Sequence, residues 1–279
     1  MVPTLPELRF AKVDGQACGL DGDRLTYREA GEAHKETVLL MHGIGSHAGG
    51  WRFILDGLSD SHRLIAWNAP GYYLSDNFAA DAPDHSQYAN AAVALLDSLG
   101  VETCHVVGSS FGSMIGTTLA ALHPERVQTL TLLGASRGQF WRPAEERAAQ
   151  MKLREDLIAN GGFEMAEQRW RQLLGKDPSE LTVTLLKELL KAIDKRAYLQ
   201  AARASDTADT LTLADRITAP THLIIGTEDA INRPAISAEI HAAITHSRMT
   251  SLEGIGHMTK LEAAPKVIEL LREHFSSEV

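Results

Sequence analysis

The feature that most constrains the fold of this chain is the sequence Gly-Ser-Ser-Phe-Gly at 108–112, which joins a strand-like run to a helix-like run. Residues 103–107 predict a short buried strand, and residues 113–122 predict a helix. A G-x-S-x-G sequence in this setting places its serine on a sharp strand-to-helix turn, with the hydroxyl exposed at the top of a sheet. Ser110 is therefore the first candidate for a nucleophile. The amide of Phe111, at the start of the helix, is a candidate donor to a developing oxyanion.

This motif needs support from its context, because the chain contains 22 glycines. A second piece is the run 38–45, in which an apolar strand ends at His42 and a glycine-rich loop leads towards Trp51. Such a loop can aim a backbone N–H at the site opposite the nucleophile. We expect Ile44 to supply this second oxyanion donor, with Gly45 as the alternative. His42 is interpreted as a hydrogen-bonding residue of the loop and not as a general base.

Two later strand ends carry the residue types that complete a nucleophile–acid–base arrangement. The strand-like run 221–226 is followed by two carboxylates, Glu228 and Asp229. A further short strand leads to His257. Either carboxylate alone would be ordinary in a solvated loop. Together with Ser110, however, these residues give the chain order serine, acid, histidine, which is one of the recurring orders of such triads.

Strand-like and helix-like segments alternate along most of the chain, which is typical of a doubly wound, mostly parallel α/β sheet. An antiparallel entry is expected near 7–12 and 24–29. The later strands are predicted near 37–41, 63–67, 103–107, 127–133, 221–225 and 248–252. The helices that accompany them are predicted near 50–59, 86–99, 110–122, 234–244 and 260–275.

The alternation breaks between 136 and 212, where the sequence predicts helix almost throughout. Helices are expected there near 143–159, 162–174, 178–192 and 195–204. The sequence therefore predicts one α/β core, formed by 1–135 and 213–279, with an inserted helical segment at 136–212.

On these features the chain resembles the α/β-hydrolase fold family, and the resemblance covers nearly all of its length. It rests on the segments 42–45, 68–71 and 108–112, on Asp229 and on the pair 256–257. The resemblance implies a mostly parallel, eight-stranded sheet flanked by helices. It also implies that the inserted segment is a cap, or lid, over the carboxyl edge of the sheet, where ligands bind in open α/β folds.

The resemblance further implies a catalytic triad and an oxyanion hole: the nucleophile Ser110, the acid Asp229, the base His257, and the amides of Ile44 and Phe111. Asp229 is preferred to Glu228 because its position relative to Gly226 matches the usual arrangement in the family. This chemistry requires no metal and no organic cofactor.

Six residues are candidates for lining a substrate site: Gly43, Trp51, Tyr72, Trp141, Trp170 and Tyr198. Trp51 and Tyr72 follow strand-end loops at the expected catalytic edge. The last three lie in the predicted cap, where aromatic side chains more often pack against other helices than bind substrate.

The resemblance implies a hydrolase that cleaves a small-molecule carboxylic ester or lactone through an acyl-serine intermediate. A carbon–carbon bond hydrolase of the meta-cleavage type is a second possibility. Those enzymes commonly carry Trp after the catalytic histidine and Asn before the nucleophile, where this chain has Met258 and Ser109. The same fold also hosts cofactor-free perhydrolases or haloperoxidase-like enzymes and non-enzymatic ligand-binding receptors, and the sequence is compatible with both.

Composition limits the partners and the compartment. The net charge is −9 and the isoelectric point is about 5.7, which disfavours nucleic acid and anionic membrane surfaces as partners. Two cysteines, Cys18 and Cys104, indicate no disulfide framework. The sequence shows no signal peptide, no membrane-spanning run and no metal-ligand spacing. We expect a soluble, cytoplasmic enzyme with a small-molecule substrate, and the sequence leaves the oligomeric state open, a homodimer included.

Overall fold

A computed structural model describes residues 2–31 and 36–276, and within them the strands form one eight-stranded sheet. The strands are β1 (Leu8–Lys12), β2 (Arg24–Ala30), β3 (Thr37–Met41), β4 (Arg63–Asn68), β5 (Cys104–Ser109), β6 (Val127–Leu133), β7 (Thr221–Gly226) and β8 (Ser247–Leu252). Their order in the sheet is β1-β2-β4-β3-β5-β6-β7-β8. β2 runs antiparallel to both of its neighbours, and all other neighbouring strands are parallel. The predicted mostly parallel sheet with an antiparallel entry is confirmed.

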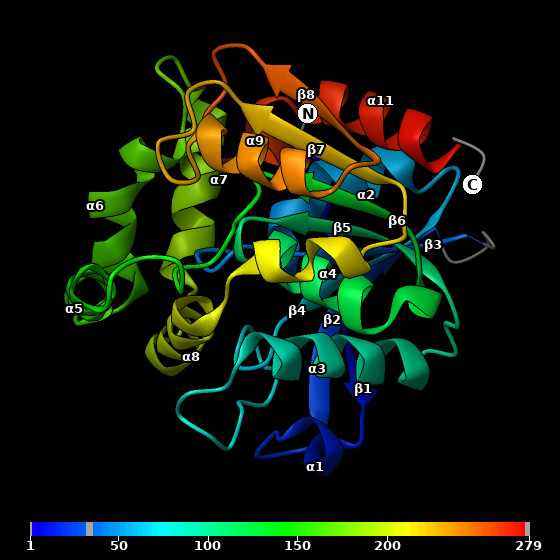
Figure 1. The fold of residues 1–279 in the computed structure, drawn as a ribbon, viewed down its shortest axis with the longest axis horizontal. Helices are drawn as coiled ribbons and strands as arrows, with labels where there is room; N and C mark the ends of the chain where they lie inside the picture. The colour runs from blue at the N-terminus through cyan, green and yellow to red at the C-terminus, as the bar shows by residue number, and fades with distance from the viewer. Residues whose placement is uncertain (1, 32–35, 277–279) are drawn as a thin grey trace.

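The helices of the α/β part lie where the alternation predicts them (Figure 1). They are α2 (Arg52–Leu58), α3 (His85–Ser98), α4 (Phe111–Leu122), α9 (Pro234–Ala243), α10 (Thr259–Glu262) and α11 (Ala264–Phe275). The single closing helix predicted for 260–275 is two helices, because Pro265 starts a new helix in the first turn of α11. Four short elements were not predicted: α1 (Gly15–Cys18), η1 (Ala48–Trp51), η2 (Pro124–Arg126) and η3 (Thr210–Arg216).

The sheet is covered on both faces, and the apolar side chains of its strands alternate between two cores. On β3, Leu39 and Met41 pack in the core that includes α3 and α4. Their neighbours Val38 and Leu40 pack in the core that includes α2 and α11. Because successive side chains of a strand point to opposite faces, a strand buried on both sides is apolar at every position. This explains why residues 38–41 of β3 form a continuous hydrophobic run in the sequence.

The inserted helices follow β6 and precede β7. They are α5 (Ala144–Ile158), α6 (Gly162–Leu173), α7 (Glu180–Lys191) and α8 (Lys195–Thr207). Figure 1 shows them gathered on one side of the molecule, beside the sheet. Each of the four predicted helices is present, with bounds that differ by up to three residues. η3 packs against α4 and α9, so the last residues of the predicted insertion lie against the core.

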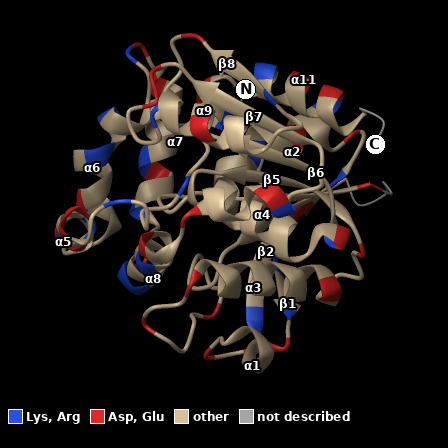
Figure 2. Cartoon of the chain, in the orientation of Figure 1, with Lys and Arg blue, Asp and Glu red and all other residues tan. Residues whose placement is uncertain are grey.

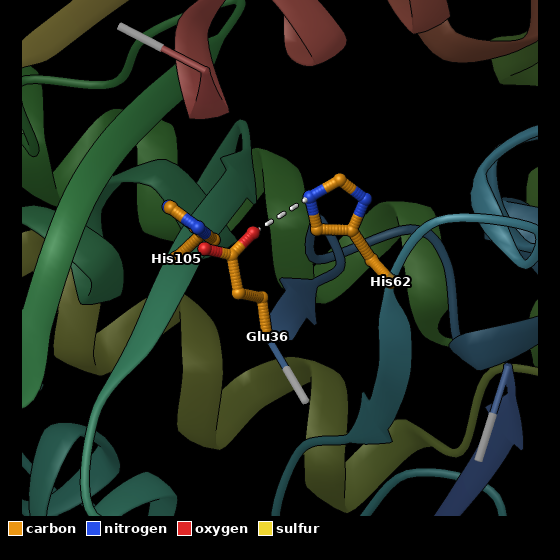
Figure 3. Close-up of side chains that lie close together, drawn as sticks. All are labelled: Glu36, His62 and His105. Carbon is orange, nitrogen blue, oxygen red and sulfur yellow. Dashed lines mark ion pairs between the residues drawn. The ribbon is translucent and has the colours of Figure 1, made fainter. Parts of the chain in front are cut away.

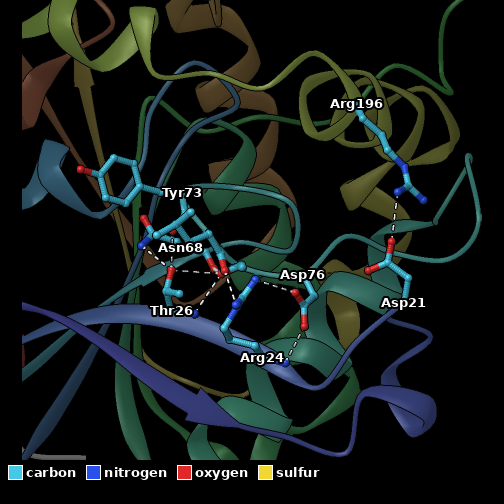
Figure 4. A network of polar contacts seen from close by, with 9 residues as sticks. Asp21, Arg24, Thr26, Asn68, Tyr73, Asp76 and Arg196 are labelled. Atoms are coloured by element: carbon cyan, nitrogen blue, oxygen red, sulfur yellow. Dashed lines mark hydrogen bonds and ion pairs between the residues drawn. The ribbon is translucent and has the colours of Figure 1, made fainter.

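A polar network fixes the loop that follows β4 (Figure 4). The Asn68 amide donates to Thr26 Oγ1 at 2.8 Å, and that hydroxyl donates to the Tyr73 carbonyl at 2.8 Å. Arg24 donates to the Leu74 carbonyl at 2.8 Å and to Asp76 at 3.0 Å. These bonds hold the loop in a tight path in which Tyr73 and Leu74 both have positive φ.

Charged residues lie on the outer helices and the loops, and β5, β6 and β7 contain none (Figure 2). Within the described residues, we find no helix with the length and hydrophobicity that a membrane crossing requires. Cys18 and Cys104 are both buried free thiols. Residues 1, 32–35 and 277–279 of the predicted core segments lie outside the described residues.

Candidate active site

Ser110 lies between the end of β5 and the start of α4, in a backbone conformation that is rare for a side-chain-bearing residue. Its φ is 55° and its ψ is −117°. The flanking glycines permit this turn: a Cβ on Gly108 would lie 2.3 Å from the Gly112 carbonyl oxygen, and a Cβ on Gly112 would lie 2.1 Å from the Met41 carbonyl oxygen. The turn is therefore the strand-to-helix elbow predicted from the motif, with the partly exposed Ser110 at its tip.

Two backbone amides are available near this serine. Phe111 is the first residue of α4, so its N–H has no acceptor within the helix. On the other side, the loop after β3 approaches closely, since a Cβ on Gly43 would lie 3.1 Å from Ser110 Cβ. Within the described residues, the Ile44 amide donates to no protein group. The Ile44 carbonyl accepts a hydrogen bond from the Tyr72 hydroxyl at 3.0 Å, which fixes the orientation of this loop.

His42 is a structural residue of the same loop. Its Nε2 accepts the Ala69 N–H at 3.0 Å, which leaves Nδ1 to donate to the Gly43 carbonyl at 2.9 Å. Burial lowers the pKa of His42 to about 3, so the imidazole is neutral at physiological pH. Both ring nitrogens are used, as expected for a residue that holds the loop and does not act as a base.

His257 is paired with Asp229 in the interior. The Nδ1 of His257 lies 2.7 Å from Asp229 Oδ2, and both side chains are buried. The other carboxylate oxygen of Asp229 accepts the backbone N–H groups of Ile231 and Asn232 at 2.8 and 2.9 Å. This carboxylate is therefore held in place by its own loop, and it directs the imidazole so that Nε2 is the nitrogen left free.

The neighbouring carboxylate, Glu228, has a different partner. Its Oε2 accepts the backbone N–H of Lys176 at 2.7 Å, and its Oε1 lies 3.4 Å from the Lys176 ammonium. Glu228 thus binds the segment between α6 and α7, whereas Asp229 binds His257. The two neighbouring acids therefore have different partners.

Ser110 and His257 line one small cavity of about 60 Å³. Gly43, Ile44 and Gly45 also line it on the core side. The inserted helices contribute mostly apolar side chains: Leu157, Met165, Arg169, Leu173, Leu190 and Tyr198. The cavity therefore lies between the core and the insertion.

Of the six residues expected to line a substrate site, Gly43 and Tyr198 do so. Trp51 does not line this cavity, because it is fully buried in η1. Tyr72 is also buried and acts on the cavity only through its hydrogen bond to Ile44. Both residues follow strand-end loops, as the sequence indicated, but they support the wall of the cavity from behind.

The two tryptophans of the insertion also lie away from this cavity. Trp141 is 38% exposed, and its Nε1 donates to the Gly138 carbonyl at 3.1 Å. Trp170 lies at a separate, open depression together with Arg171 and Glu228. The residue type alone does not give the direction in which a side chain faces.

Two residues of α10 belong to the site although sequence reasoning did not select them. Lys260 lines the cavity, and its Nζ donates to Ser109 Oγ at 2.7 Å. Glu262 accepts three backbone N–H groups, from Gly175 at 2.7 Å and from Gly256 and Met258 at 3.2 Å. Burial raises the pKa of the Glu262 carboxyl. The only sequence signal for both was their closeness to His257.

Glu262 explains how the loop that carries His257 is held. Gly256 and Met258, on either side of His257, both donate to its carboxylate. The His257 N–H donates to the Leu173 carbonyl at 3.0 Å, which joins the same loop to the end of α6. The histidine loop is therefore fixed to the inserted segment as well as to the core.

Within residues 2–31 and 36–276, one group of side chains could offer three metal ligands: Glu36, His62 and His105 (Figure 3). Their ligand atoms lie within 4.8 Å of one another, and His62 Nε2 lies 3.5 Å from Glu36 Oε2. Glu36 and His62 directly precede β3 and β4, and His105 is at the start of β5. Because Ser110 follows the other end of β5, this group lies at the opposite edge of the sheet and takes no part in the site.

Comparisons with known proteins agree with this fold. A family model described as alpha/beta hydrolase fold matches residues 36–157. A 2-hydroxy-6-oxononadienedioate/2-hydroxy-6-oxononatrienedioate hydrolase of Paraburkholderia xenovorans is 28% identical over 263 residues, which cover 88% of this chain and 89% of that protein. A 2-hydroxy-6-oxo-6-phenylhexa-2,4-dienoate hydrolase of Comamonas testosteroni is 31% identical over 191 residues, covering 67% of this chain and 65% of that protein.

Two solved structures show the same fold. An esterase from Thermogutta terrifontis superposes with a TM-score of 0.84 at 18% identity, covering 96% of this chain and 97% of that one. An enol-lactonase from Burkholderia xenovorans superposes with a TM-score of 0.83 at 22% identity, covering 96% and 100%. At these identities the likeness concerns the fold alone.

Proposed function

Because the chain belongs to the α/β-hydrolase fold family and the two relatives described above are named as hydrolases, we propose that it cleaves a small-molecule carboxylic ester or lactone through an acyl-serine intermediate. One observation carries this proposal. Ser110, on the strained elbow, lines the same cavity as His257, and His257 is held by the buried carboxylate of Asp229. A serine, an imidazole and a carboxylate in this relation form the arrangement that activates a hydroxyl for attack on a carbonyl.

The mechanism follows from these contacts. Asp229 engages Nδ1 of His257, so Nε2 is the nitrogen that takes the Ser110 proton as the hydroxyl oxygen attacks the carbonyl carbon. The tetrahedral oxyanion is stabilised by the amides of Ile44 and Phe111, and one such donor contributes roughly 10²- to 10³-fold to kcat. His257 then protonates the leaving alcohol. Water, deprotonated by the same imidazole, finally attacks the acyl-enzyme and regenerates Ser110.

The inserted segment acts in this proposal as a cap that sets substrate size. Leu157, Met165 and Leu190 give the cavity an apolar wall opposite Ser110. A small apolar cavity binds an acyl chain mainly by hydrophobic burial, so short to medium chains fit and long lipid chains do not. The segment 136–212 supplies specificity and contributes no member of the triad.

Substitution of two aromatic residues of the inserted segment tests the proposed role of the cap in setting substrate size. Tyr198 lines the cavity and Trp141 does not. Tyr198→Ala is expected to shift the preference towards longer acyl chains, by about fourfold in kcat/KM for each methylene newly accommodated. Trp141→Ala is expected to leave the profile unchanged. The measurement is kcat/KM over an ester series from acetate to octanoate. An unchanged profile in Tyr198→Ala, or a wild-type preference for long-chain triglycerides, would contradict this role.

A second candidate is a carbon–carbon bond hydrolase, and the names of the relatives favour it. In that reaction the same triad would act on a vinylogous diketone. Two departures weigh against it: Met258 follows His257, and Ser109 precedes Ser110, where the meta-cleavage enzymes commonly have Trp and Asn. Hydrolysis of an ester or lactone therefore remains the main proposal.

One panel of substrates separates the two candidates. The purified protein is assayed against simple esters, lactones and 2-hydroxy-6-oxo-dienoates, with Ser110→Ala as the blank for each. We expect the highest kcat/KM on an ester or a lactone. A dienoate hydrolysed orders of magnitude faster than every ester and lactone would select the second candidate.

A further inference from the structure

Lys260 is a buried cation within the candidate site, and the proposed reaction gives it no role. Its side chain is 1% exposed and lines the cavity shared by Ser110 and His257. Among the described residues it forms no ion pair. A buried ammonium without an anion is costly, and in most proteins such a group is paired with a carboxylate.

The contacts of Lys260 leave part of its hydrogen-bonding capacity unused. Its Nζ donates to Ser109 Oγ at 2.7 Å and lies 4.9 Å from the centre of the Trp51 ring. An ammonium has three N–H donors. The hydroxyl accepts one of them, and the aromatic ring attracts the cation without accepting a conventional hydrogen bond. At least one N–H donor therefore remains for a group inside the cavity.

The position of Lys260 places this donor beside the nucleophile. Its acceptor, Ser109, is the residue that directly precedes Ser110. Ser46 also lines the cavity. Gly50 packs against both Ser46 and Lys260, since a Cβ on Gly50 would lie 2.5 Å from Ser46 Oγ and 3.7 Å from Lys260 Cε. The ammonium thus contacts the Ser109 hydroxyl and an aromatic ring next to the elbow, and none of the residues lining the cavity is Asp or Glu.

We propose that Lys260, oriented by the Ser109 hydroxyl and the Trp51 ring, binds a carboxylate carried by the acyl part of the substrate. The substrate class is then a half-ester or lactone of a short dicarboxylic acid, or another acyl compound that bears a free carboxylate near its scissile carbonyl. This inference deepens the proposed function and rests on it for the bond that is cleaved. The bound carboxylate supplies the anion that Lys260 lacks in the protein itself.

The charge state of Lys260 gives the proposal a pH signature. Burial lowers the pKa of Lys260 to about 7. The titratable groups around it are His42, which is neutral; His257, which is paired with Asp229; and Arg169 across the cavity. Glu262, on the same helix, is engaged by three backbone N–H groups. Lys260 is protonated below about pH 7 and loses its charge as the pH rises above that value. Carboxylate binding is therefore expected to be strong at pH 6 and to weaken about tenfold per pH unit above 7.

The first experiment compares charged and neutral esters of similar shape. The pairs are monoethyl malonate with ethyl isovalerate, and monoethyl glutarate with ethyl hexanoate. We expect the wild type to favour the charged member of at least one pair at pH 6. Lys260→Met is expected to lower the charged-to-neutral ratio of kcat/KM by roughly 10- to 100-fold, the range for a hydrogen bond to a charged group. The effect should lie mainly in KM. Because the proposed triad acts on both esters alike, its contribution cancels in the ratio.

Three further variants make the test specific. Lys260→Arg keeps the charge at every pH, so its ratio should stay high and lose its dependence on pH. Lys266→Met removes an exposed lysine that pairs with Glu269 at 2.7 Å, and it should leave the ratio unchanged. Arg169→Met removes the other cation of the cavity. If Arg169→Met abolishes the preference and Lys260→Met does not, the carboxylate binds on the cap side and the inference is wrong.

A binding measurement separates this inference from the proposed function. Glutarate is titrated into the wild-type protein and its binding is measured by calorimetry, which requires no turnover. We expect binding at pH 6, proton uptake on binding at pH 7 to 8, and loss of both in Lys260→Met. If no ester or lactone is hydrolysed but this binding is present, the proposed reaction fails and the carboxylate site stands. Absence of both the binding and the ester preference, or equal loss of charged and neutral turnover in Lys260→Met, overturns the carboxylate site.

Discussion

Ser110→Ala is expected to abolish both hydrolysis and labelling by a fluorophosphonate serine probe. The hydroxyl on the elbow is the only group proposed to form the covalent intermediate, so its loss is expected to reduce kcat by roughly 10⁶-fold. Alanine removes a single oxygen from a partly exposed side chain, so the fold should be retained. Intact-protein mass spectrometry should show one added probe on the wild type and none on Ser110→Ala.

Ser113 provides the matched control for this labelling. It lies one turn into α4, and its Oγ donates to the Ser110 carbonyl and accepts the Ser136 N–H at 2.9 Å. Its hydroxyl is thus used within the elbow and is buried. Ser113→Ala should still be labelled at Ser110. Probe mass on another serine in Ser110→Ala would contradict the assignment.

The strands and the order of the site residues could be predicted because they depend on local sequence. Residues 38–41 and 64–67 are apolar at every position, a pattern that is typical of a strand buried on both faces. Glycines mark the sharp turns after β5 and β7, because a side chain at these positions would clash with neighbouring backbone atoms. In a parallel sheet, the carboxyl ends of the strands share one edge. Residues from distant parts of the chain could therefore be assigned to one site.

The walls of the cavity could not be predicted in the same way, because they depend on which direction each side chain faces. Trp51 and Tyr72 follow the correct strands, yet both are buried behind the loop that contains Ile44. Trp141 and Trp170 lie in the correct segment and face elsewhere. Conversely, Lys260 would ordinarily be assigned to the surface, since buried lysines are rare. Only the packing of α10 against η1 shows that its ammonium is enclosed.

The two adjacent acids after β7 give the second large prediction. Asp229→Asn is expected to lower kcat by about 10⁴-fold, because an amide at this position favours the wrong tautomer of His257 and no longer stabilises the imidazolium. The change is nearly isosteric, and the side-chain oxygen can still accept the N–H groups of Ile231 and Asn232. The loss should therefore appear in kcat with the thermal stability largely kept.

Glu228→Gln is the control, since Glu228 and Asp229 are neighbours in sequence with different partners. Glu228 binds Lys176 on the inserted segment, so its amide variant should reduce kcat/KM only a few-fold, through a less firmly held cap. Measuring kcat, KM and melting temperature for both variants at one pH distinguishes the two roles. If Glu228→Gln proves the more damaging change and Asp229→Asn is mild, then the carboxylate that supports the base is not the one that contacts His257 in this structure, and the proposed triad must be reassigned.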